Sequence, residues 1–177
     1  GGIAEQVSDR QTGFIVPPRD PDQLAAKLRE LIENVELRDR FAQNGYDEYA
    51  KRLAHYCKYK DELLQVNSKS KEISVLKKVE GEAILKKIVP TDFVVILDEN
   101  GKDFSSINFA TQLQQWLNQH AHIVFVIGGA YGFSEEVYAR ANLKLSLSSF
   151  TFSHQLVPLI FGEQLYRAFT ILKGEPY

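Results

Sequence analysis

The amino-acid sequence predicts an α/β fold with a mostly parallel sheet. Two apolar runs carry this prediction: residues 93–97, and residues 122–127, which a glycine-rich turn and a helix follow. Continuous apolar runs are typical of strands that are buried on both faces of a parallel sheet. The order strand, turn, helix, strand is that of a doubly wound sheet, which binds ligands beyond the carboxyl ends of its strands.

The first 43 residues predict a short strand and a helix. The strand is the apolar stretch 13–16, which two prolines close. The helix follows Asp20, a good N-cap, and has Pro21 at its first position. The apolar side chains of this helix fall on one stripe. They are Leu24, Leu28, Leu31 and Ile32.

The middle of the chain predicts two further helices. Residues 45–56 are expected to form an amphipathic helix, and residues 59–66 a strand that three charged side chains weaken. A helix over residues 73–88 follows, with one apolar face directed inward. Lysines crowd its outer face, either as a solvated surface or as a contact with RNA, and the solvated surface is the simpler interpretation. They are Lys77, Lys78, Lys86 and Lys87.

The last part of the chain completes the sheet. We expect a turn over residues 98–102 and a helix over residues 108–119. A short strand over residues 143–147 then leads into a long terminal helix. The three strand ends are expected to converge on one crevice. These ends are Leu97, Ile127 and Leu147.

Composition excludes several classes of protein. The chain has 177 residues, a formal net charge of −2, no methionine and one cysteine, Cys57. It has no apolar run long enough to cross a bilayer. Its small negative net charge does not indicate a protein whose whole surface attracts nucleic acid. One cysteine excludes an internal disulfide and fits a reducing compartment, so we expect a cytoplasmic protein that binds no membrane. Because residue 1 is glycine and methionine is absent, we expect the start to be a cut or fused end.

The turn at residues 128–132 reads G-G-A-Y-G, and Ser134 after it is a natural N-cap followed by two glutamates. These carboxylates would repel a phosphate at the place where dinucleotide folds bind one. The glycines therefore indicate one of two things. Either a ligand without phosphate approaches the backbone closely, such as an adenosyl group with a positive centre, or the turn needs positive φ.

Two other kinds of site are disfavoured. His120 and His122 have no third metal ligand nearby, so we expect no metal. A serine nucleophile at Ser148 or Ser149 with His154 as base lacks a glycine-flanked elbow and an acid to orient the histidine.

Residues 1–43 resemble the end of the nucleotide-sugar-binding domain of family 4 glycosyltransferases. The shared motifs are G-G-I-x-E-x-V, T-G-F-x-V-P-P and the D-P-x-x-L-A helix. In that family the acidic catalytic motif and most of the donor pocket lie upstream. We therefore expect this fragment to serve as packing, with Glu5 as the one position that matches a donor contact.

The second domain, expected over residues 44–177, contains six distinctive stretches. They are E-Y-x-K-R-L, E-G-E-A-I-L, V-I-L-D-E-N-G-K, F-V-I-G-G-A-Y-G, L-S-L-S-S-F-T-F-S-H-Q and E-Q-L-Y-R-A-F. In these stretches the domain resembles the RlmH family of SPOUT-class methyltransferases. The resemblance implies S-adenosylmethionine-dependent methylation of N3 of a pseudouridine in large-subunit ribosomal RNA. It also implies a SPOUT-type α/β trefoil knot, which general connection rules treat as exceptional, and a homodimer that holds the cofactor in the knot.

The resemblance also places the site residues. By position, the family's cofactor contacts fall on Leu97, Gly128, Leu147, Ser148, Ser149, Phe150, Thr151 and Phe152. Three polar positions that the family keeps near its active site fall on His154, Arg167 and Tyr177, which are therefore the candidate catalytic residues. The terminal helix has more apolar surface than its own sheet needs, which favours the homodimer.

The chain departs from the RlmH family in three places. The family's first strand, of the type M-K-I-x-L-L-V-V-G-K, is absent, and the family's chain continues past the point where this one stops. A basic residue expected four positions after His154 is Pro158. With Ser153 as N-cap, Pro158 would break a helical hydrogen bond, unless the helix restarts there. We therefore expect weak or absent methyl transfer with cofactor binding partly retained.

Two alternative functions remain open. The first is a non-catalytic knotted dimer that serves as a scaffold, and the second, ranked third overall, is a glycosyltransferase fragment.

Overall fold

The computed structural model describes residues 7–66, 70–152 and 156–175. The chain divides into two compact units, the first ending at Tyr59 and the second beginning at Lys60. Within the described residues, no helix is both long and apolar enough to span a membrane.

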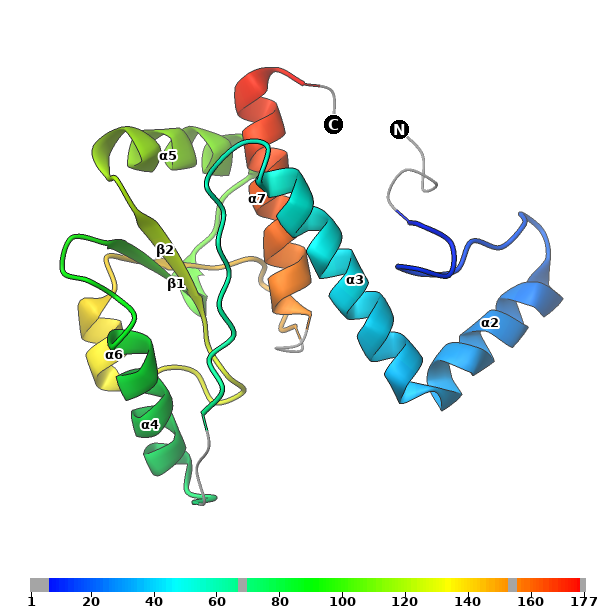
Figure 1. The fold of residues 1–177 in the computed structure, drawn as a ribbon, viewed down its shortest axis with the longest axis horizontal. Helices are drawn as coiled ribbons and strands as arrows, with labels where there is room; N and C mark the ends of the chain where they lie inside the picture. The colour runs from blue at the N-terminus through cyan, green and yellow to red at the C-terminus, as the bar shows by residue number, and fades with distance from the viewer. Residues whose placement is uncertain (1–6, 67–69, 153–155, 176–177) are drawn as a thin grey trace. The chain divides into compact units, whose positions relative to one another are not determined.

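The first unit contains two helices in contact, α2 (Pro21–Glu33) and α3 (Val35–Leu53) (Figure 1). α2 begins as predicted, because the side chain of Asp20 accepts a hydrogen bond of 2.9 Å from the backbone N–H of Gln23. None of the residues of α2 is buried. α3 runs without interruption through Asn44, so the expected junction in the sequence lies inside a helix.

Two predicted strands do not form. Residues 13–16 contribute only an isolated bridge between Asp9 and Gly13, and residues 59–66 have no regular structure. Both predictions are wrong for the same physical reason. An extended segment becomes a strand only where a neighbouring strand accepts and donates its backbone hydrogen bonds, and neither segment has such a neighbour among the described strands.

The second unit is a three-layer α/β domain around a parallel sheet (Figure 1). The strand order is β2-β1-β3, and both pairings are parallel, which confirms the predicted α/β class. The strands are β1 (Phe93–Lys102), β2 (Ile123–Ile127) and β3 (Leu143–Leu145). The helices are α4 (Ile73–Leu85), α5 (Ser106–Gln119), α6 (Glu135–Arg140) and α7 (Val157–Lys173).

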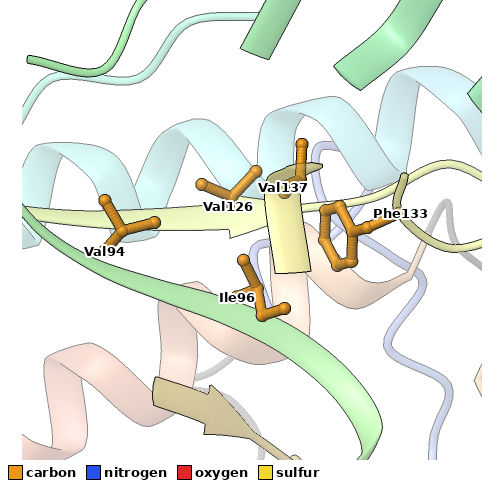
Figure 2. Packing of buried hydrophobic residues seen from close by; sticks show 5 residues of the cluster. All are labelled: Val94, Ile96, Val126, Phe133 and Val137. Atoms are coloured by element: carbon orange, nitrogen blue, oxygen red, sulfur yellow. The ribbon is translucent and has the colours of Figure 1, made fainter. Parts of the chain in front are cut away.

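α4 and α6 cover one face of the sheet. The core of this face is a cluster from β1, β2 and the start of α6, which Figure 2 shows from close by. Its members are Val94, Ile96, Val126, Phe133 and Val137. Val94 and Ile96 are fully buried, as the apolar run 93–97 predicted, and so is Val137. The end of α4 and the turn after it pack against this cluster.

α5 and α7 pack together on the opposite face. The alternate residues of β1 and β2 point to this side, since side chains alternate along a strand. The ring centroid of Phe93 lies 5.5 Å from that of Trp116 in α5. The ring centroid of Phe125 lies 4.7 Å from that of Phe161 in α7. The buried face of α5, with Phe109, Leu113 and Trp116, is therefore the inner surface of this layer.

Several element boundaries differ from those predicted, and three of them bear on the site. β3 ends at Leu145, so the expected strand end at Leu147 is wrong and Leu147 lies in the loop after the strand. The expected turn over residues 98–102 belongs to β1, which continues to Lys102 with a shift of register after Leu97. α7 begins at Val157, so Pro158 lies in its first turn, where a backbone N–H has no helical partner in any case. The predicted break inside the terminal helix therefore does not occur. The helix begins next to Pro158, which corresponds to the alternative of a helix that starts there.

Candidate functional site

The carboxyl edge of the sheet brings together the segments that sequence reasoning singled out. Leu97 of β1 is in register with Ile127 of β2 and with Leu145 of β3. Gly128 directly follows Ile127, and the loop 147–152 begins two residues after Leu145. Three of the candidate cofactor segments therefore start from one edge of the sheet.

The loop 147–152 has an ordered beginning and an exposed end. Ser146 is buried, and its hydroxyl donates a hydrogen bond of 3.1 Å to the carbonyl of Ser148. The hydroxyl of Ser148 in turn accepts a hydrogen bond of 2.9 Å from the N–H of Phe150. Leu147 and Ser148 are partly buried, whereas the later candidates are exposed. These are Ser149, Phe150, Thr151 and Phe152.

Arg167 is the one candidate catalytic residue within the described part of the chain. It lies in α7 and forms an ion pair with Glu163 one turn earlier, in which Nη2 is 2.6 Å from Oε1. Its Nε donates to the same oxygen at 3.1 Å. His154 and Tyr177 lie outside the described residues.

The turn after β2 uses its glycines in different ways. Gly132 has a φ of 75°, and its N–H donates to the carbonyl of Gly129 at 3.2 Å. A Cβ on Gly128 would lie 3.0 Å from the ring of Phe133, and one on Gly129 would lie 3.0 Å from a carboxylate oxygen of Glu80. Positive φ therefore explains Gly132, whereas close approach of the chain's own side chains explains Gly128 and Gly129.

A pair of hydrogen bonds fixes β1 just beyond Leu97, and sequence reasoning missed it. The carboxylate of Asp98 accepts 2.9 Å from the N–H of Asn100 and 2.6 Å from the hydroxyl of Tyr138 in α6. Partial burial raises the pKa of Asp98. These hydrogen bonds and the charge of Lys144 together lower the pKa by more than burial raises it, so the pKa of Asp98 lies below its usual value. The hydrogen bond to Asp98, with burial and the charge of Asp98, raises the pKa of Tyr138 to about 12.

A close contact joins α4 to the start of α6. A Cβ on Gly81 would lie 2.3 Å from the hydroxyl oxygen of Ser134. Ser134 is the N-cap of α6, as predicted, and its hydroxyl accepts a hydrogen bond of 3.4 Å from the N–H of Val137. The absence of a side chain at Gly81 thus allows the two helices to meet beside the glycine turn.

The histidine pair makes structural contacts. The ring of His120 stacks on Phe93 with centroids 4.3 Å apart, and Nδ1 of His122 lies 3.6 Å from Oδ1 of Asp92. Across residues 7–66, 70–152 and 156–175, no three histidine, cysteine, aspartate or glutamate side chains are grouped to hold a metal ion.

The lysines of α4 and the turn after it have different surroundings. Lys87 forms an ion pair with Glu62 of the preceding segment. Lys78 and Lys86 are exposed, and the charge of Lys78 contributes to lowering the pKa of Glu136, after hydrogen bonds from the α6 backbone and Ser134.

Comparison with known families gives two matches along the chain. The family described as "Predicted SPOUT methyltransferase" matches residues 30–177. The family described as "Glycosyl transferases group 1" matches residues 1–48. The two matches overlap over the end of α2 and most of α3.

Several curated relatives carry the name ribosomal RNA large subunit methyltransferase H. The protein of Christiangramia forsetii is 54% identical over 132 residues, which are 73% of this chain and 84% of the relative. The protein of Flavobacterium psychrophilum is 54% identical over 138 residues, which are 76% of this chain and 88% of the relative. The protein of Clostridium botulinum is 44% identical over 153 residues, which are 83% of this chain and 96% of the relative.

Proposed function

Because this chain belongs to the SPOUT methyltransferase family, we propose that it methylates ribosomal RNA of the large subunit. The target is N3 of a pseudouridine, and the methyl donor is S-adenosylmethionine. The observation that carries the proposal is the identity of 54% with relatives named for this activity, over 73% and 76% of the chain.

The carboxyl edge of the sheet suits this donor. The donor carries a positively charged sulfur and no phosphate. The turn beside the edge has Glu80 close to Gly129, and Glu135 and Glu136 at the start of α6, where the charge of Lys78 acts on Glu136. Gly128 directly follows the last residue of β2, so the backbone of the glycine turn begins at this edge. Leu97, Gly128 and the loop 147–152 would hold the donor there.

The donor supplies a methyl group on a sulfonium. When bound, it would give its methyl group to N3 of the uracil ring as the carbon–sulfur bond breaks and the N3 proton leaves. Orientation of N3 in line with the methyl group is the main contribution asked of the protein. We assign Arg167, with His154 and Tyr177, to the surroundings of the target base, and the proton goes to a nearby base or to the RNA environment.

The wider architecture belongs to the same proposal. We propose a trefoil knot and a homodimer for the SPOUT domain, a cytoplasmic location, and domains of residues 1–43 and 44–177. The family match supports the knot. Phe161, Leu165 and Phe169 of α7 are already buried within the chain, so the apolar surface that this helix leaves for a second copy is smaller than the sequence suggested. It consists of Leu156, 45% exposed, and the partly buried Val157 and Ile160. The two family matches support a chain of two parts, whereas the compact units of the structure divide between Tyr59 and Lys60 rather than at residue 44.

The test is transfer of labelled methyl from S-adenosylmethionine to large ribosomal subunits that lack the modification. Label should enter the large-subunit RNA, and mass spectrometry of the digested RNA should place it on N3 of a pseudouridine. Hydrogen exchange of residues 147–152 should slow when the donor is added. Donor binding without transfer would favour the non-catalytic scaffold, and the absence of both would refute the proposal.

A further inference from the structure

Helix α4 brings one carboxylate to the glycine turn. The two side-chain oxygens of Glu80 would lie 3.0 and 3.3 Å from a Cβ built on Gly129. Gly129 comes two residues after Ile127, which is in register with Leu97. Glu80 therefore reaches the carboxyl edge of the sheet, although it belongs to the helix layer on one face.

The charge of Glu80 is not balanced within the described part of the chain. None of the described residues forms a hydrogen bond or an ion pair with its side chain, which is partly buried. The ionisable residues that open α6 beside the same turn are also acidic, Glu135 and Glu136. A ligand with positive charge at this turn would therefore meet a carboxylate that no described side chain pairs.

We infer that Glu80 recognises the positive charge of the methyl donor and thereby distinguishes the donor from the demethylated product. This inference rests on the proposed function. S-adenosylmethionine and S-adenosylhomocysteine share the adenosine and the amino-acid group, but only the donor carries a positive sulfur. An unpaired carboxylate near that sulfur stabilises the donor alone, and the product then leaves more readily. A Cβ at position 129 would press on this carboxylate and shift it by a few tenths of an ångström, so glycine there leaves the carboxylate where it lies.

The test compares the affinities of the full chain for the two ligands by titration calorimetry. In the wild-type chain, S-adenosylmethionine should bind more tightly than S-adenosylhomocysteine. Glu80→Gln should reduce that preference by about tenfold, the scale of one partly screened charge contact, chiefly through weaker donor binding. Glu82→Gln, an exposed position on the same helix, is the matched control and should leave the preference unchanged.

A second variant keeps the inference open to refutation if Glu80→Gln unfolds the chain. Gly129→Ala should displace the carboxylate and lower the preference in the same direction. An equal loss of affinity for both ligands would overturn the inference, because it would assign Glu80 to the ribose, the amino group or the fold. An unchanged preference in Glu80→Gln would overturn this inference alone. A wild-type chain that binds neither ligand would refute the proposed cofactor as well.

Discussion

Substitution of Gly81 by alanine tests how tightly α4 is joined to the glycine turn. The new Cβ would lie 2.3 Å from the hydroxyl oxygen of Ser134 and 2.9 Å from its Cβ. Ser134 is only 8% exposed and caps α6, so it has little room to move. Alanine gains about 1 kcal/mol in helix propensity, but overpacking costs about 1–3 kcal/mol and a lost cap about 1 kcal/mol more. We expect a net loss of about 1–3 kcal/mol in the free energy of unfolding.

Urea denaturation of the full chain measures this loss, and a double-mutant cycle assigns it. Ser134→Ala alone should cost about 1 kcal/mol, and Gly81→Ala should cost less in that background because the hydroxyl is gone. Glu82→Ala on the exposed side of α4 should change stability by less than about 0.5 kcal/mol. If Gly81→Ala instead raises the free energy of unfolding, helix propensity prevails and the described contact between α4 and α6 is not tight.

Three further predictions follow from the site and its supports. Tyr138→Phe removes the hydrogen bond to Asp98 and should cost about 1 kcal/mol. Because the folded pKa of Tyr138 is raised to about 12, above that of the unfolded chain, its contribution to stability is complete below pH 10 and is lost as the pH rises to 12. The stability of Tyr138→Phe should therefore fall less over that range, and an identical decline would exclude this hydrogen bond as its cause. Pro158→Ala should change the urea midpoint little, because Pro158 lies in the first turn of α7; a large gain would show that the proline strains the helix. Arg167→Ala should reduce methyl transfer at least tenfold while calorimetry finds unchanged donor affinity, and a loss of both together would assign Arg167 to the fold.

Local patterns in the sequence predict most of the second unit. The run 93–97 forms the central strand with Val94, Val95 and Ile96 fully buried, and Ser134 is the N-cap of α6, because both depend on neighbours in the chain. The predictions that failed depend on distant partners. Residues 59–66 have strand-like stretches but no adjacent strand, and residues 98–102 look like a turn but return to pair with β3 at Leu145.

The same distinction applies to the candidate site. Adjacent parallel strands place Leu97 beside Ile127, the residue before Gly128, so their neighbourhood could be predicted from the fold class, although β1 itself continues to Lys102. The contact of Glu80 with Gly129 and the hydrogen bond between Asp98 and Tyr138 could not. Each joins side chains far apart in the sequence, and no spacing rule connects an α4 or α6 position to the end of a particular strand.

α2 differs from every helix around the sheet, because none of its residues is buried and its stripe of Leu24, Leu28 and Ile32 is 46%, 49% and 74% exposed. Its amide hydrogens are consequently protected by little more than the helix itself, so they exchange with solvent through local fraying rather than through global unfolding. Proteases that need an unwound segment would cleave there first. Digestion would then remove the amino-terminal piece early and leave the sheet domain as the resistant fragment.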